Sequence, residues 1–296
     1  MRHATIRPVT GERWSSTCVV CGPTSVGLVH RKDPYRIVRC EGCELVYVEG
    51  ASALGNLNDF YGEEYFYSSG ESVCGYRDYT RDEELHARNA RALLSEVERL
   101  TPRRGALLDV GCAHGFLLEA AHGRGWRSVG VDISSKAIHY AREKLGQTAF
   151  EGDLGSCHFP PESFDAVCMI GSIEHMTDPM RALTGAARLL TRGGVLVVTT
   201  IDIEGWLGYF SWKPPEHLFY FSFWTLSRLI ARAGLAVESK RTYWSQYRAS
   251  DLAGRLWGYW DLPRAGRVWK MMEAVGADRL SIRIPTNEVL VAARKP

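Results

Sequence analysis

The sequence predicts a doubly wound α/β fold, and three observations support that prediction. Segments typical of strands and of helices alternate between residues 106 and 201, as expected for strands joined by crossover helices. The strand segments are continuous apolar runs, which indicates a parallel sheet covered on both faces. A glycine-rich turn, "DVGCAHGF" at residues 109–116, leads from the first of these strands into a helix. Open sheets of this kind bind ligands at the carboxyl ends of their strands.

The elements follow one another in a regular order. Residues 80–100 have apolar residues at helical spacing and predict a lead-in helix. Strands are then expected at "ALLDV", "SVGVDI", "TAFEGD", "FDAVCMI" and "VLVVTTI", with helices at "GFLLEAAHGRG", "SSKAIHYAREKLG" and "DPMRALTGAARLL" between them. A helix "SFWTLSRLIARAG", a short strand "LAVESK" and a final strand "EVLVAAR" complete the series. Between those last two strands, the aromatic and basic stretch that begins at Tyr243 is expected to be helical.

Four cysteines near the amino terminus form two pairs. They are Cys18, Cys21, Cys40 and Cys43, in the pattern C-x2-C-x18-C-x2-C. This spacing predicts a structural zinc site, because four thiolates complete a tetrahedral shell and leave no position for water. Two disulfides or reactive thiols are the alternatives. We therefore expect a zinc-binding module over residues 1–55, followed by a larger domain over 56–296.

Composition restricts the class of protein only loosely. The chain has 296 residues, a formal net charge of +2 and 8 cysteines. So many cysteines favour a reducing compartment, and we expect a cytoplasmic protein. A charge this close to zero does not indicate nucleic acid as a partner. The first residues, "MRHATIRPVTGERWSS", lack the apolar core of a signal peptide, and no run approaches the ~20 apolar residues of a membrane span.

The glycine-rich turn does not suit a dinucleotide. The G-x-G-x-x-G pattern fails, because Ala113 replaces its second glycine and Phe116 its third. Asp109 directly precedes the turn. Its carboxylate would repel a phosphate and attract an ammonium or sulfonium group.

Beyond these physical arguments, "LLDVGCAHGFLLEA" resembles the first motif, D/E-x-G-x-G/A-x-G, of class I S-adenosylmethionine (SAM) dependent methyltransferases. Asp132, "EGDL", "FDAVCMIGSIEHMTDP" and "LLTRGGVLVVTT" follow in the order of that family's later motifs. The resemblance implies a seven-stranded Rossmann-like sheet. It implies that Asp132 binds the ribose hydroxyls and Asp153 the adenine amino group. The cofactor residues it implies are Asp109, Gly111, Cys112, Ala113, Gly115, Asp132, Ile133, Asp153, Leu154 and Ile170.

The cysteine module in front of this domain resembles bacterial sugar C-methyltransferases and related natural-product enzymes. The resemblance implies a small-molecule acceptor: a sugar, a glycoside or another specialised metabolite. It also implies that Tyr61, Tyr65 and Tyr76 close over the cofactor or acceptor. We expect residues 241–284 to cap the acceptor side, with packing on the sheet edge, a homodimer contact or a membrane-surface contact as alternatives.

Methyl transfer requires a base that removes a proton from the acceptor, and a histidine of near-neutral pKa suits that role. His217, in "WKPPEHLFYFS", is the candidate base, because the resembling enzymes carry a Glu-His pair matched here by Glu216 and His217. A structural or substrate-orienting role is its alternative. His175, in "SIEHM", is expected to line the acceptor pocket. A divalent cation beside it is not expected, since Gly171 stands where the cation motif E-x-x-E-H has its first acid.

Two other functions compete with this interpretation. An RNA or DNA methyltransferase that docks through its zinc module is one. The sequence disfavours it, because "GSIEH" stands where base N-methylating enzymes have an acid or Asn followed by Pro-Pro and an aromatic residue, and no Pro-Cys occurs. The other is a SAM-binding interaction protein without catalysis. Neither the methylated atom nor the oligomeric state is fixed by the sequence.

Overall fold

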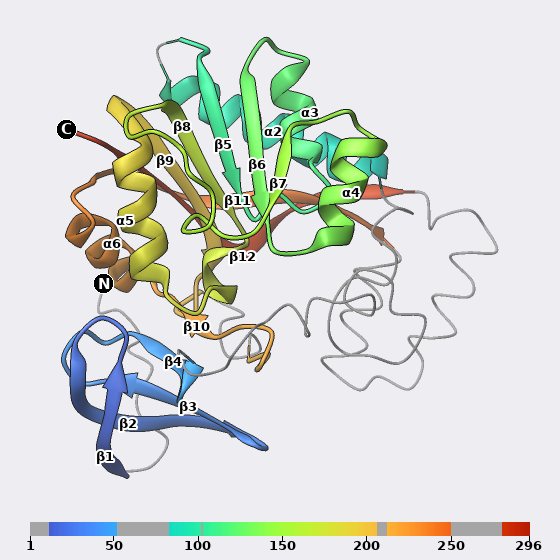
Figure 1. Ribbon diagram of the computed structural model, residues 1–296. Helices are drawn as coiled ribbons and strands as arrows, with labels where there is room; N and C mark the ends of the chain where they lie inside the picture. Colours follow the sequence, from blue (N-terminus) through green and yellow to red (C-terminus); the bar gives the residue numbers. More distant parts are fainter. Residues whose placement is uncertain (1–11, 52–82, 102, 206–211, 250–279) are drawn as a thin grey trace.

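The computed structural model describes residues 12–51, 83–101, 103–205, 212–249 and 280–296. Two β-sheets organise these residues (Figure 1). The larger sheet has seven strands and is wrapped by helices, and the smaller sheet contains the amino-terminal strands. The expected doubly wound α/β fold with a seven-stranded Rossmann-like sheet is confirmed.

The seven-stranded sheet has the order β11-β12-β9-β8-β5-β6-β7. Its parallel part consists of β5 (Ala106–Val110), β6 (Arg127–Asp132), β7 (Ala149–Glu151), β8 (Phe164–Ile170) and β9 (Leu190–Ile201). Two antiparallel strands, β11 (Ala236–Arg248) and β12 (Ser281–Arg294), extend the sheet beyond β9. The order reverses at β5, which pairs with β6 on one side and β8 on the other. A reversal of this kind opens a crevice at the carboxyl ends of the strands.

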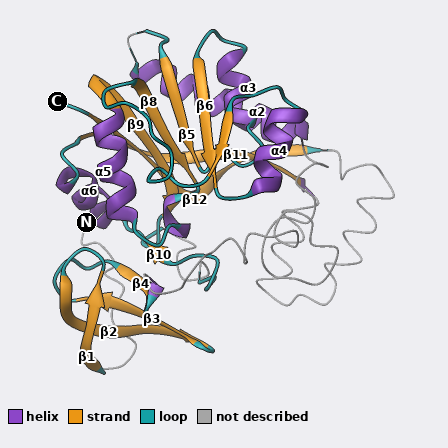
Figure 2. Ribbon diagram, viewed as in Figure 1, coloured by secondary structure: helices purple, strands orange, loops and turns teal. Residues whose placement is uncertain are grey.

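Helices cover both faces of this sheet (Figure 2). One core contains Leu108, Val167 and Leu196 of the strands together with residues of α5 (Pro179–Leu189) and α6 (Phe223–Arg232). The opposite core contains the neighbouring strand residues Leu107 and Ala166, packed on α2 (Glu83–Leu100) and α3 (Phe116–His122). Successive strand residues therefore enter opposite cores, which is why these strands are apolar throughout.

Local sequence signals set where several helices begin. Helix α4 (Ser135–Glu143) starts after Ser134, whose side chain accepts a hydrogen bond from Ala137 N. Asp178 caps α5 in the same way, and Ser222 forms a capping box with Thr225 at the start of α6. These side chains satisfy backbone N–H groups that have no partner within the helix.

The smaller sheet has the order β1-β2-β3-β4-β10. It contains β1 (Arg13–Cys18), β2 (Gly22–Lys32), β3 (Tyr35–Cys40) and β4 (Val46–Val48). Its fifth strand, β10 (Phe219–Tyr220), comes from a distant part of the sequence, after β9, and pairs antiparallel with β4. The sequence did not predict this pairing, and the amino-terminal module thus shares a sheet with residues that follow β9.

One helical prediction is wrong. Residues 243–248 belong to β11, which runs for 13 residues, and β12 runs for 14. The two strands pair from Ala236 and Arg294 to Arg248 and Ser281, with irregularities in register. Tyr243, Trp244 and Tyr247 are aromatic residues that favour strands. Pairing with β12 makes this segment a strand and not a helix. Residues 241–248 and 281–284 of the predicted cap therefore belong to the strand pair at the sheet edge, whereas residues 250–279 lie outside the described residues.

Candidate active site

The turn after β5 is shaped to let a ligand approach its backbone. Gly111, Ala113 and Gly115 all have positive φ, at 80°, 44° and 84°. A Cβ on Gly111 would lie 2.6 Å from Cβ of Ser172, so this position requires glycine. Gly111 N and Cys112 N donate to Val131 O at 2.8 and 3.1 Å, which holds the turn against β6.

Asp132 orders the same turn from the end of β6. Its Oδ2 accepts from Ala113 N at 2.8 Å, and its Oδ1 accepts from Ser134 N at 2.9 Å. Each carboxylate oxygen has a second lone pair, so Asp132 keeps acceptor capacity for the hydroxyl contacts that the resemblance implies. Burial raises the pKa of Asp132, although the two backbone hydrogen bonds oppose that shift.

Asp109 is the most deeply buried acid of this crevice. Its side chain is 3% exposed, and its Oδ1 has no hydrogen-bond partner among the described residues. Burial, together with the charge of Asp132, raises the pKa of Asp109 to about 7. A buried carboxylate with unused acceptor capacity is costly without a partner, and a cationic ligand would supply one.

The other expected cofactor residues lie along the same edge, because β5, β6, β7 and β8 are mutually parallel. Asp153 is exposed, and its Oδ1 accepts from Gly155 N at 2.9 Å and Ser156 N at 2.7 Å. Ile133 and Leu154 are half-buried, as is Ile170 at the end of β8. The side chain of Cys112 is buried and packs among Leu118 and Ile138, so a ligand at this turn would meet its backbone.

The candidate catalytic residues come together beyond the end of β8. A short helical turn, η3 (Ile173–His175), carries Glu174 and His175. The rings of His175 and His217 lie 4.8 Å apart, edge to face. His175 Nδ1 lies 2.6 Å from Glu216 O, and because a carbonyl only accepts, Nδ1 donates. The structure therefore brings all three sequence-predicted catalytic residues to one place.

Burial controls the charge of these groups. It lowers the pKa of His217 well below its usual range, and nearby His175 and Lys213 lower it further. Burial also lowers the pKa of His175, although the Glu216 carboxylate opposes the shift. His217 is thus neutral at physiological pH. Its unprotonated ring nitrogen can accept a proton, but the depressed pKa makes it a weaker base than the near-neutral histidine that the sequence suggested.

Glu174 is a functional candidate that the sequence suggested only as half of an incomplete cation motif. It is 4% exposed, and its Oε2 has no hydrogen-bond partner in the described part of the chain. Burial raises the pKa of Glu174 to about 8. Ligand atoms of Glu174, His175 and His217 all lie within 4.8 Å of one another, a grouping that no linear spacing reveals.

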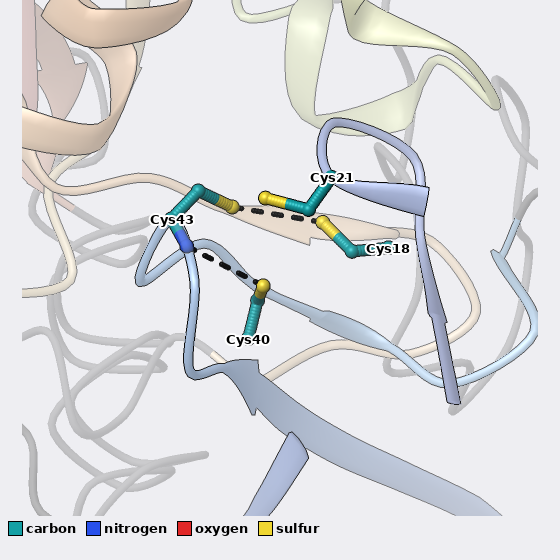
Figure 3. Close-up of side chains that lie close together, drawn as sticks. All are labelled: Cys18, Cys21, Cys40 and Cys43. Atoms are coloured by element: carbon teal, nitrogen blue, oxygen red, sulfur yellow. Dashed lines mark hydrogen bonds between the residues drawn. The ribbon is translucent and has the colours of Figure 1, made fainter. Parts of the chain in front are cut away.

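The four paired cysteines form the other cluster able to hold a metal. Their sulfur atoms lie within 4.8 Å of one another, and the Sγ atoms of Cys18 and Cys43 are 3.6 Å apart (Figure 3). Sulfurs in a tetrahedral zinc site are separated by roughly 3.8 Å. Backbone N–H groups of Val20 and Cys43 donate to the sulfurs of Cys18 and Cys40, each at 3.4 Å. All seven described cysteines are free thiols, so this donor set fits zinc.

Some expectations cannot be placed. Tyr61, Tyr65 and Tyr76, expected to close over the site, lie outside the described residues.

No helix in the described ranges combines the length and apolarity needed to cross a membrane.

Comparison with known proteins supports the class of domain. Residues 108–198 match the family model of the methyltransferase domain. The ubiquinone biosynthesis O-methyltransferase of Thiobacillus denitrificans is 35% identical over 115 residues, which cover 36% of this chain and 49% of that protein. Its counterpart in Dechloromonas aromatica is 32% identical over 102 residues, covering 32% and 44%. The chain thus spans about half the length of the curated relatives it matches.

Solved structures agree on the fold. A SAM-dependent methyltransferase of Thermotoga maritima aligns with a TM-score of 0.50 at 23% identity and covers 74% of this chain and 94% of that one. A chain of the Haloferax volcanii complex between the Trm112 methyltransferase activator and a methyltransferase aligns with a TM-score of 0.52 at 19% identity, covering 74% and 95%. Residues 108–198 thus match a methyltransferase domain, and the solved structures agree with the fold of such a domain. The chain's resemblance to one particular subclass, the sugar C-methyltransferases, is not established by these matches.

Proposed function

We propose that the protein transfers a methyl group from SAM to a small-molecule acceptor, with His217 as the general base. The acceptor class we favour is a sugar, a glycoside or another specialised metabolite that carries a hydroxyl group. The observation that carries this proposal is the buried, neutral imidazole beyond β8, the strand next to β5. The printed names of the curated relatives, which are O-methyltransferases, support oxygen as the methylated atom.

In this proposal, different residues bind the cofactor, remove the proton and position the base. SAM already carries an activated methyl group, so the enzyme has to align it with the acceptor and remove a proton. Asp109 and Asp132 hold the cofactor at the β5 and β6 ends. His217 accepts the acceptor proton, and Glu216 fixes His175 through its backbone carbonyl. The cysteine cluster holds a structural zinc ion.

Transfer of an isotopically labelled methyl group tests the proposal. The protein is incubated with methyl-labelled SAM and an extract of the organism that encodes it, and the labelled product is identified by mass spectrometry. Label in a small hydroxylated metabolite is the expected result. Label in RNA or DNA would instead support docking of nucleic acid through the cysteine module. SAM binding without any labelled product, in extracts from several growth conditions, would support a binding protein.

The affinity for SAM is expected to rise on the order of tenfold from about pH 6 to about pH 7.5. The pKa of Asp109 is about 7, so the fraction of carboxylate increases by about that factor over this range. The charged form attracts the cationic cofactor, and the protonated form does not. Isothermal titration calorimetry measures the change. Asp109→Asn should bind weakly and lose most of the pH dependence, whereas the exposed Glu143→Gln should keep it. An unchanged slope in Asp109→Asn would contradict the assignment.

An alternative role for the cluster of Glu174, His175 and His217 is to bind a divalent cation. Glu174, His175 and His217 offer three ligand atoms within 4.8 Å, and His217 supplies the ligand that the sequence motif lacked at Gly171. Such a cation would orient and acidify the acceptor hydroxyl. The unpartnered Oε2 of buried Glu174 favours this alternative.

Glu174→Gln distinguishes the two roles of the cluster. The pKa of Glu174 is about 8, so without a cation the group is protonated at pH 7 and glutamine is its near match. The base role therefore predicts activity within about threefold of wild type, and no loss on dialysis against a chelator. The cation role predicts loss of activity in both experiments, with recovery of the dialysed wild type on addition of Mg²⁺ or Mn²⁺. The zinc content of each sample is measured in parallel, so that loss of metal from the cysteines is recognised.

A further inference from the structure

His217 lies in a segment that is held from two sides. Its neighbour Leu218 donates through N to Glu174 O at 2.8 Å, which attaches the segment to η3 of the methyltransferase domain. The carbonyl oxygen of the same Leu218 accepts from Val48 N at 2.8 Å, which attaches it to β4 of the amino-terminal sheet. The residue beside the imidazole thus bridges the two parts of the molecule.

The far end of β2 makes a second attachment to the same segment. Lys32 Nζ donates to Trp212 O at 3.2 Å. The ring of His30 stacks on that of Trp212, with centroids 5.6 Å apart. Trp212 is five residues before His217, and it is 7% exposed. The amino-terminal sheet therefore contacts the segment both at its start and next to its imidazole.

Hydrogen bonds inside the segment transmit these attachments to His217. His217 N donates to Lys213 O at 2.8 Å, and Lys213 N donates to the hydroxyl oxygen of Tyr220 at 3.1 Å. Tyr220 belongs to β10 and lies opposite Val46 of β4. A shift of Trp212 relative to β10 would therefore strain the backbone that carries the imidazole.

The cysteine cluster belongs to the same connected structure. The strand β4 begins at Val46, shortly after Cys43, and the backbone oxygen of Cys43 accepts from Arg228 Nη1 of α6 at 3.4 Å. Arg228 Nη1 also lies 3.7 Å from the Glu44 carboxylate. The sheet that the cysteines organise thus reaches helix α6, just beyond the segment of His217.

We propose that the amino-terminal sheet positions the imidazole of His217, with Lys32 and Val48 as positioning residues. The proposal rests on the proposed function of His217 as a base. A base must lie within hydrogen-bonding reach of the proton it removes, and small displacements of a catalytic group reduce the rate strongly. The segment 212–218 contributes no strand to the seven-stranded sheet, so the smaller sheet adds to the support that the hydrogen bond to η3 gives it.

Substitution of Lys32 tests whether the amino-terminal sheet positions His217, at a residue that is not among the expected cofactor residues. Lys32→Met is expected to lower kcat about three- to tenfold and to leave the SAM affinity unchanged within about twofold, because one hydrogen bond of typical strength is lost. Lys32→Arg keeps a donor and should restore most of the rate. Arg31→Met is the matched control: Arg31 pairs with Glu12, 3.5 Å away, and not with the segment of His217. It should behave as wild type.

A spectroscopic readout makes the test independent of turnover. The side-chain nitrogen resonances of His217, assigned by comparison with His217→Gln, should shift in Lys32→Met and not in Arg31→Met. Equal rates for these two variants, with unmoved His217 resonances, would overturn the proposal. A wild-type rate in His217→Ala together with shifted resonances in Lys32→Met would remove the base assignment and leave the positioning intact.

Discussion

His217→Ala is expected to lower kcat by about 10²- to 10⁴-fold, the usual contribution of a general base, while the affinity for SAM stays near that of wild type. His217 is 4% exposed and its ring lies beside that of His175, whereas the expected cofactor residues lie at the ends of β5 to β8. The rate is measured at saturating SAM with the acceptor that methyl labelling identifies. His139→Ala, an exposed histidine of α4, is the control and should retain the full rate. A wild-type rate in His217→Ala would refute the role.

The pH dependence of kcat gives the same assignment an independent signature. Burial depresses the pKa of His217 well below its usual value of 6.5, and only the neutral ring accepts a proton. We therefore expect kcat to be constant from about pH 6 upward and to fall only at lower pH, where the ring becomes protonated. Asp109, whose pKa is about 7, affects cofactor binding instead. Saturating SAM therefore separates the two titrations, and a rise in kcat centred near pH 7 would contradict a depressed His217.

Most of the larger sheet could be predicted because each strand is recognisable from its own residues. The runs at β5, β8 and β9 are apolar on both faces, since alternate residues enter two different cores. The capping residues Ser134, Asp178 and Ser222 mark helix starts in the sequence. The glycines in the turn after β5 identify the ligand edge, because their positive φ values are costly for residues that carry a Cβ. Each of these features depends on a short stretch of chain.

The features that sequence could not reveal depend on distant partners. β10 is two residues long, too short for periodicity, and exists because β4 offers an edge to pair with. Residues 243–248 form a strand because β12, placed nearly forty residues later, supplies hydrogen-bonding partners. The meeting of Glu174 with His217 similarly depends on the backbone bond between Leu218 N and Glu174 O. The residue types in the site were predictable, and their grouping was not.

The cysteine cluster is expected to bind one zinc ion per chain, and its loss should unfold the amino-terminal sheet. Cys40→Ser removes a ligand that is fully buried, and a structural zinc site contributes on the order of 10 kcal/mol to folding. The variant should lose its zinc and become sensitive to limited proteolysis within residues 12–51. Cys157→Ser is the matched control, because Cys157 is a half-buried free thiol outside the cluster. Metal content is measured by mass spectrometry of the purified proteins. A Cys40→Ser protein with full zinc content would contradict the site.

Because β10 completes the amino-terminal sheet, this zinc prediction extends to the catalytic segment. Loss of the metal should free β4 and so release Leu218 O from Val48 N. The residues expected to bind SAM lie at the ends of β5, β6, β7 and β8, and none of these strands pairs with a strand of the small sheet. Cys40→Ser should therefore still bind SAM within a few-fold of wild type and yet transfer methyl groups poorly. Equal loss of SAM binding and of turnover would instead indicate that the two parts of the chain unfold together.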